Sequence, residues 1–104
     1  MWNPERGRQI LYLSRAQIEA LDFSLDDVIA VVEACFVEKA AGRVEMPPKP
    51  GIHTRPDAFI HAMPAYLSSL GASGMKWVSG YPENRRLGLP YITGLLVLNC
   101  PETG

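Results

Sequence analysis

The chain has 104 residues, of which 47% are hydrophobic and 20% charged, and its formal net charge is -1 at pH 7. This composition is typical of a folded globular protein with one modest core and excludes a disordered chain. The near-neutral charge and the lack of a long apolar run exclude a nucleic-acid-binding surface, a membrane span and a signal core, so we expect a cytoplasmic protein.

The N-terminal part favours a short strand followed by two helices. Residues 9–13 (QILYL) have β propensity. Ser14 and Gln17 form a capping-box pattern, which predicts a short helix from Arg15 to Leu21. Ser24 and Asp27 repeat the pattern before a second helix over residues 25–41, and Gly42 predicts where that helix ends.

The second predicted helix carries an apolar stripe. Leu25, Val28, Val32 and Phe36 recur at steps of three and four residues, which places them on one helical face. We expect this face to belong to the core and to pack on a sheet.

The middle of the chain favours an extended loop and two strands. Residues 46–56 contain Pro47, Pro48, Pro50 and Pro56, which disfavour helix and remove backbone donors. A strand is predicted from Phe59 to near Pro64, and another over residues 74–79. Alternation along the second strand places Met75, Trp77 and Ser79 on one face and Lys76 and Val78 on the other.

The C-terminal part favours a turn, a long strand and a second turn. Residues 80–88 are rich in turn formers, and Tyr91 to Leu98 is the longest predicted strand, in which Gly94 marks a bulge or a close backbone approach. The order β-α-α-β-β-β predicts an α+β fold, with two N-terminal helices packed on a mostly antiparallel β-sheet. Residues 99–104 (NCPETG) are typical of a hairpin turn, yet no partner strand follows. Because an unpaired edge favours aggregation, we expect a longer product.

Three side chains stand out as candidates for chemistry. Lys76 lies mid-strand among apolar neighbours, where its ammonium must meet an anion or reach water from a sheet edge, and the sequence leaves both open. Lys49 lies in the proline-rich loop, which either aims its charge or leaves it simply exposed. His61 alternates with apolar residues and is either a ligand-binding or proton-transferring group or a structural histidine. The arginines are expected to be solvated charges: Arg43, Arg55, Arg85 and Arg86.

Motifs for other chemistry are missing from the sequence. There is no G-x-G-x-x-G turn, and residues 71–76 fail the phosphate-loop pattern. The histidines and cysteines do not have metal-ligand spacing, so we expect no metal site. The residues by themselves therefore predict only an anion-binding α+β domain.

Several motifs in a fixed order point to a known family. In that order they resemble the ornithine cyclodeaminase/mu-crystallin family, and the likeness extends from the opening strand and Ser14–Arg15 to the last residue. The motifs are MPPK (46–49), AMPAYL (62–67), GMKWVSGYPEN (74–84), GLP (88–90) and LNCPETG (98–104).

The resemblance implies a domain arrangement and an activity. Residues 1–104 would form the N-terminal substrate-binding and dimerisation domain, truncated before a Rossmann domain that holds NAD or NADP. The shared reaction of the family is hydride exchange between nicotinamide and an amine or imine carbon next to a carboxylate. A full-length protein would then be a homodimeric ornithine cyclodeaminase, ketimine reductase or amino-acid dehydrogenase, and the fragment would be inactive. The alternatives are a non-enzymatic small-ligand-binding module like mu-crystallin and a segment that serves only dimerisation.

The resemblance also assigns roles to individual residues. Lys76 matches the lysine that faces the substrate in the active site, and Lys49 matches a basic residue that binds the substrate carboxylate. Two converging ammonium groups suit that task. His61 stands at a substrate-binding position where a relative has an arginine, and Tyr91 stands where a cofactor-contacting threonine is common. Asn84 matches the asparagine of the Gly-Tyr-Pro-Glu-Asn turn, which we interpret as turn-forming first and cofactor-binding second.

Overall fold

The computed structural model describes residues 3–104, which form two helices and a five-stranded antiparallel sheet. The chain divides into two compact units, Met1–Val32 and Glu33–Gly104. The helices are α1 (Arg15–Glu19) and α2 (Leu25–Ala40), and the strands are β1 (Val44–Glu45), β2 (Gly51–Ile52), β3 (Phe59–Leu67), β4 (Ala72–Gly80) and β5 (Ile92–Asn99). The α+β class predicted from the sequence is confirmed.

The capping residues act as the sequence predicts. The Ser14 hydroxyl accepts from the backbone N–H of Gln17, whose side chain accepts in return from the Ser14 N–H, and α1 begins after this box. The Asp27 N–H donates to the Ser24 hydroxyl over 3.1 Å, and the Asp27 carboxylate accepts from the Ser24 N–H over 2.8 Å. The predicted range of α1 was two residues too long, because it ends at Glu19.

Gly42 ends α2 in a turn in which two backbone N–H groups bond back to carbonyls of the last helical turn. The N–H of Gly42 donates to the Lys39 carbonyl, and the N–H of Arg43 donates to the Glu38 carbonyl. Gly42 has φ 73°, a left-handed conformation that favours glycine. The turn brings Arg43 back alongside the last turn of the helix.

The predicted strand over residues 9–13 is wrong. These residues lie in no strand, and Ile10 is 92% exposed. All the strand pairs of the described chain lie between residues 44 and 99, so the β-prone run has no partner to complete a ladder. Propensity by itself does not make a strand.

The apolar stripe of α2 spans the boundary between the two compact units. Leu25 is 72% exposed and Phe36 is 68% exposed, and α2 buries none of its described residues. The helix was predicted correctly from its periodicity, and the packing of its apolar face on the sheet stays a prediction.

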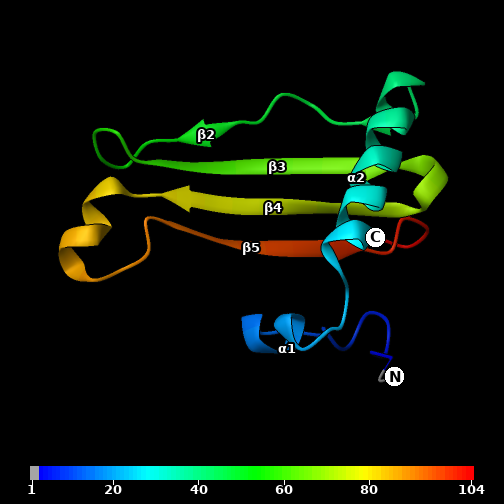
Figure 1. Ribbon diagram of the computed structural model, residues 1–104, viewed down its shortest axis with the longest axis horizontal. Coiled ribbons are helices and arrows are strands. Elements are labelled where there is room, and N and C mark those ends of the chain that lie inside the picture. The colour runs from blue at the N-terminus through cyan, green and yellow to red at the C-terminus, as the bar shows by residue number, and fades with distance from the viewer. Residues whose placement is uncertain (1–2) are drawn as a thin grey trace. The chain divides into compact units, whose positions relative to one another are not determined.

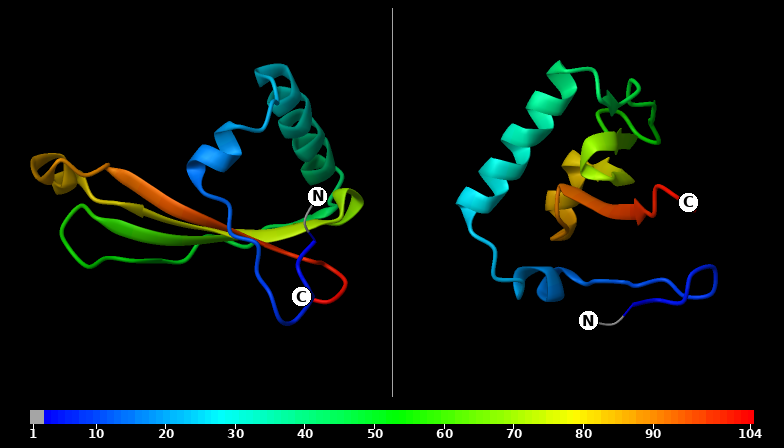
Figure 2. Two further views of the ribbon diagram at one scale, coloured as in Figure 1. Left: turned by 90° about the horizontal axis from the view of Figure 1, so that it is seen from below. Right: turned by 90° about the vertical axis from the view of Figure 1, so that its right-hand side faces the viewer.

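The strands form one twisted layer in the order β1-β3-β4-β5, with β2 also paired to β3 (Figure 1). Seen edge-on, β3, β4 and β5 curve together as a single sheet (Figure 2). β4 lies at the centre and is paired along its length with β3 on one side and β5 on the other. The loop predicted at residues 46–56 contains the short β2, and β1 precedes it.

β3 continues through Pro64, which the sequence predicted to end it. The Ala62 N–H points away from β4 and donates to the Pro50 carbonyl over 3.1 Å. Alternation turns the Pro64 nitrogen to the same edge, at a gap between the residues paired with β2 and those paired with β1. The missing N–H of proline therefore costs no ladder bond there.

The register defines the two faces of the sheet, because residues directly opposite in antiparallel strands share a face. The face that carries Lys76 and Val78 is called the lysine face, and the face that carries Trp77 and Met75 the tryptophan face, as alternation predicts. β4 and β5 are paired without a bulge past Gly94, where an added Cβ would lie 2.9 Å from the Trp77 carbonyl oxygen. Gly94 therefore marks a close backbone approach.

No helix within residues 3–104 is long and apolar enough to span a membrane.

Candidate functional site

The two candidate lysines lie on the same face of the sheet. Lys76 in β4 is directly opposite Met63 in β3. On the other side of β3, Pro50 bonds to Ala62, so alternation places Lys49 next to Met63 on the lysine face. The two lysines flank Met63, with backbones about two strand spacings, roughly 10 Å, apart. That separation is short enough for two lysine side chains to reach a common small anion.

Both lysines are exposed, and neither has an ion-pair partner within residues 3–104. Lys76 lies on the central strand β4 and not at a sheet edge, so the predicted edge position is wrong, although its side chain does reach water. A buried anion partner is also not present among the described residues. The charges of Lys49 and Lys76 are therefore uncompensated by the protein on this face.

His61 lies beside these lysines on the same face. It is opposite Gly51 in β2 and Val78 in β4, which places it diagonally next to Lys76. Its ring stacks on the Phe59 ring, with centroids 4.3 Å apart and planes 19° from parallel. Burial lowers the pKa of His61 below its ordinary value, and the positive charges of Lys49 and His53 lower it further. His61 therefore favours its neutral form.

The charges of the two faces differ. The strand residues of the lysine face include no carboxylate, whereas the tryptophan face carries Glu45. A negatively charged ligand is thus favoured on the lysine face. The sequence analysis considered His53 only as a metal ligand. It missed that His53, which follows β2, lies close enough to His61 to affect its pKa.

Tyr91 and Asn84 lie at another place, at the end of the sheet where β4 leads into β5. The segment between the strands contains a 3-10 helix, η2 (Pro82–Leu87). The Asn84 side-chain amide donates to the Pro90 carbonyl over 3.0 Å, and the Asn84 carbonyl accepts from Leu89. The Arg85 guanidinium lies over the Tyr91 ring, 5.4 Å from its centroid, so Arg85 is more than a solvated charge.

These two residues are not brought next to the lysines. Lys76 is opposite Leu96, and Tyr91 lies five residues before Leu96, a distance of about 16 Å along an extended strand. Asn84 has the turn-forming role predicted for it. The candidate site is therefore elongated, with cations near its middle and Tyr91 at one end.

A cavity of about 460 Å³ lies away from the candidate lysines. It is lined by residues of β1, β3, β4 and β5 and by the C-terminal turn, among them Glu45, Tyr66, Ser73 and Asn99, and by neither Lys49 nor Lys76. Within the part of the chain that the structure describes, no group of His, Cys, Asp and Glu residues is placed to hold a metal ion.

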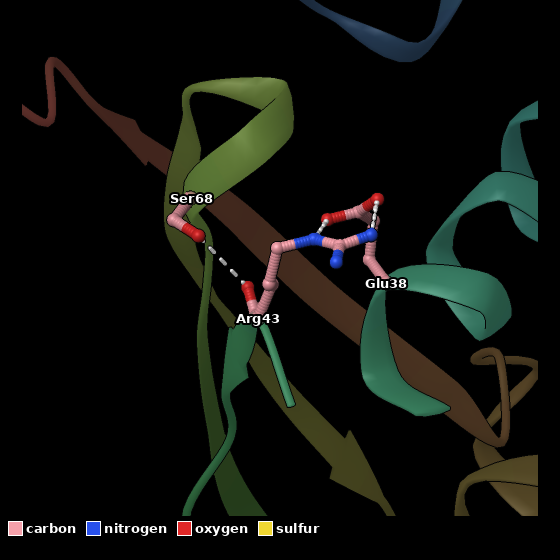
Figure 3. A network of polar contacts seen from close by, with 3 residues as sticks. All are labelled: Glu38, Arg43 and Ser68. Atoms are coloured by element: carbon pink, nitrogen blue, oxygen red, sulfur yellow. Dashed lines mark hydrogen bonds and ion pairs between the residues drawn. The ribbon is translucent and has the colours of Figure 1, made fainter. Parts of the chain in front are cut away.

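Arg43 was expected to be a solvated charge, but it is bound to Glu38 (Figure 3). Its Nε and one terminal nitrogen each donate to a Glu38 carboxylate oxygen over 2.8 Å, and its carbonyl accepts from the Ser68 hydroxyl over 3.1 Å. The Arg43 bond, with a second from Ser69, lowers the pKa of Glu38 to about 2. The glycine turn at Gly42 was the sequence signal that could have predicted this pair.

Comparison with known proteins decides the family. The model of the ornithine cyclodeaminase/mu-crystallin family matches residues 8–104. This chain belongs to the ornithine cyclodeaminase/mu-crystallin family. The resemblance deduced from the motifs is confirmed.

Three relatives show how much of a family member the chain represents. It is 43% identical over 95 residues to the nodulation efficiency protein NfeD of Rhizobium meliloti, covering 91% of this chain and 30% of that protein. Its fold matches Thermococcus litoralis Δ1-pyrroline-2-carboxylate reductase in complex with NADH and L-proline, with TM-score 0.86, 40% identity and coverage of 91% and 29%. It also matches an archaeal alanine dehydrogenase dimer with bound NAD, with TM-score 0.78, 39% identity and coverage of 86% and 27%. The chain spans less than a third of each relative.

Proposed function

We propose that residues 1–104 are the substrate-binding part of a longer NAD(P)-dependent enzyme that acts on an amino or imino acid. The observation that carries this proposal is the placement of Lys49 and Lys76 on one face, on either side of Met63, without a carboxylate among the strand residues of that face. The solved relatives support it, because one is in complex with NADH and L-proline and the other with NAD.

The lysines would bind the substrate through its carboxylate. Each ammonium donates charge-assisted hydrogen bonds, which are about twice as strong as neutral ones, and the two together fix the orientation of a planar carboxylate. Lys76, on the central strand, would face the reacting carbon and move a proton at the amine or imine nitrogen. Lys49, in the proline-rich segment, contributes binding and not chemistry.

The residues of this chain fit only the nicotinamide end of the cofactor. NAD(P), when bound, supplies or accepts the hydride. Tyr91 lies just before the first residue of β5 and Asn84 lies in the preceding turn, so these two would contact the nicotinamide side. The sequence has no glycine-rich turn for the pyrophosphate. The other part of the cofactor would therefore be held by a Rossmann domain outside this chain.

The experiment is a substrate screen with the full-length protein. NADH and NADPH oxidation are followed with cyclic imino acids, and NAD and NADP reduction with proline, alanine and ornithine. Turnover of at least one is expected, whereas the 104-residue chain is expected to have none. If no substrate is turned over and a small ligand binds tightly, the protein is a binding module like mu-crystallin and the enzymatic proposal is wrong.

We expect the full-length protein to be a homodimer. The archaeal alanine dehydrogenase is described as a dimer, and the apolar residues of β5 are exposed here, with Leu98 at 77% and Leu96 at 64%. Such surfaces favour association with another polypeptide. Sedimentation of the full-length protein tests the expectation, and a monomer at micromolar concentration would contradict it.

A further inference from the structure

Two glycines lie opposite two aromatic rings on the lysine face. Gly51 is in register with His61, and Gly80 is in register with Phe59. A Cβ added at Gly51 would collide with Cδ2 of His61 and lie 2.9 Å from its Nε2. A Cβ added at Gly80 would collide with the Phe59 ring. Each ring therefore occupies space that a side chain on the neighbouring strand would fill.

The two rings depend on each other as well as on the glycines. Phe59 and His61 are stacked, with centroids 4.3 Å apart. Phe59 lies over the β4 backbone and His61 over the β2 backbone, so the stack bridges three strands on one face. The position of the stacked rings therefore depends on the absence of a side chain at Gly51 and at Gly80.

We propose that Gly51 and Gly80 are positioning residues of the candidate site, which hold the His61 imidazole beside Lys49 and Lys76, where it hydrogen-bonds the amine or imine nitrogen of the substrate. The substrate contact rests on the function proposed above. The placement of the two rings by the two glycines does not.

The division of roles follows from the chemistry of the three side chains. The lysine ammonium groups only donate hydrogen bonds, which suits the carboxylate, and the Lys76 ammonium can in addition give a proton to the substrate nitrogen. A neutral imidazole has one donor and one acceptor nitrogen, which suits an amine or imine. Within residues 3–104 no protein atom hydrogen-bonds to the His61 ring. Its nitrogens are thus available for a ligand.

Glycine is needed for geometry more than for folding. The atoms that an added Cβ would meet belong to the ends of side chains, so the rings swing away and the ladder persists. Gly51→Ala should therefore leave the sheet intact and move the His61 ring. The matched control is Ile52→Ala, because Ile52 is the next residue in β2, lies on the tryptophan face and is 54% exposed.

The first test is a pH titration of the 104-residue chain by NMR. The chain has two histidines, so two C2–H resonances are expected, and His53→Gln assigns them. Gly51→Ala and Gly80→Ala should both shift the His61 resonance and raise its midpoint toward 6.5, while Ile52→Ala leaves it unchanged. The same His61 titration in Gly51→Ala and in the parent chain would overturn the proposal. If Gly51→Ala does not fold, Gly80→Ala and Phe59→Leu, which remove the stack from its other side, decide it.

The second test is a double-mutant cycle in the full-length enzyme. Gly51→Ala and His61→Gln should each raise KM for the amino or imino acid about tenfold, the value of one hydrogen bond, with a smaller change in kcat. If Gly51 acts through His61, Gly51→Ala has no further effect when His61→Gln is present. Additive effects would contradict a positioning role.

The two proposals fail in different ways. An enzyme that turns over no amino or imino acid contradicts the proposed function and with it the substrate contact of His61. The NMR titration then still decides whether Gly51 and Gly80 place the ring. A displaced ring with unchanged KM would overturn the substrate contact and leave the enzymatic proposal intact.

Discussion

The two faces of the sheet are built from the same strands but differ in charge and in exposed apolar area. The lysine face carries Lys76 and His61 beside Lys49, without a carboxylate on its strands, and its β5 leucines Leu96 and Leu98 are highly exposed. The tryptophan face has the acid Glu45 and the less exposed Trp77 and Leu95. The backbone of β4 is paired along its whole length with β3 and β5, and this pairing is common to the two faces. The difference teaches that pairing builds the sheet, while side-chain alternation decides which face can bind an anion.

The largest expected effect is on the lysine face itself. Lys76→Met keeps the apolar stem of the side chain and removes the ammonium. It should therefore nearly abolish turnover in the full-length enzyme, with kcat lowered by on the order of 100-fold or more. The control is Met75→Leu, the neighbouring residue on the tryptophan face, which should keep near-normal kinetics. Steady-state kinetics with wild-type rates for Lys76→Met would refute the assignment.

A smaller effect is expected at the other lysine. Lys49→Ala should raise KM about 10- to 100-fold and change kcat much less, because it removes binding shared by substrate and transition state. Lys39→Ala, which removes an exposed lysine in the last turn of α2, is the control. A fall in kcat at constant KM would assign Lys49 to chemistry instead.

A third change lies off both faces and should affect stability without affecting KM. The pKa of Glu38 is lowered from 4.5 to about 2 in the folded chain, so the unfolded chain binds a proton more readily between these values. The stabilisation by Glu38 and Arg43 is present above pH 4.5 and is lost as the pH falls toward 2. Arg43→Met should be less stable than the parent at pH 6, and the difference should shrink toward pH 2.5 in urea unfolding. A constant difference would show that Arg43 acts by packing.

The smallest effect is expected at the turn between β4 and β5. Asn84→Ala removes the donor to the Pro90 carbonyl and should cost about 1 kcal/mol of unfolding free energy. Thermal unfolding measures that loss. Because Asn84 is turn-forming first, KM for the amino or imino acid should stay within about twofold, and a rise limited to KM for the nicotinamide cofactor would add the cofactor contact to its role.

Much of the local structure was predictable because its causes are local. The capping boxes at Ser14 and Ser24 and the stop at Gly42 involve residues three to five positions apart. The alternation that separates Lys76 from Trp77 is a property of any extended strand. The strand prediction for residues 9–13 was wrong because a strand also needs a partner that lies far away in the sequence.

The candidate site was predictable in its residue types but not in its geometry. Lys76 and Lys49 were identified one by one, and nothing local places Lys49 beside Met63, which depends on the pairing of Pro50 with Ala62. The Phe59–His61 stack over Gly51 and Gly80 likewise needs three strands in register. Glu38 and Arg43 meet only because the turn at Gly42 reverses the chain.

The sequence by itself determined the helix starts, the end of α2, the turns, the alternation of the strands and, through its motifs, the family. The tertiary structure decided which cations share a face and which ring lies over which backbone. The physical reason is that caps and alternation arise from bonds between near neighbours, whereas register and burial arise from contacts between segments far apart in the chain.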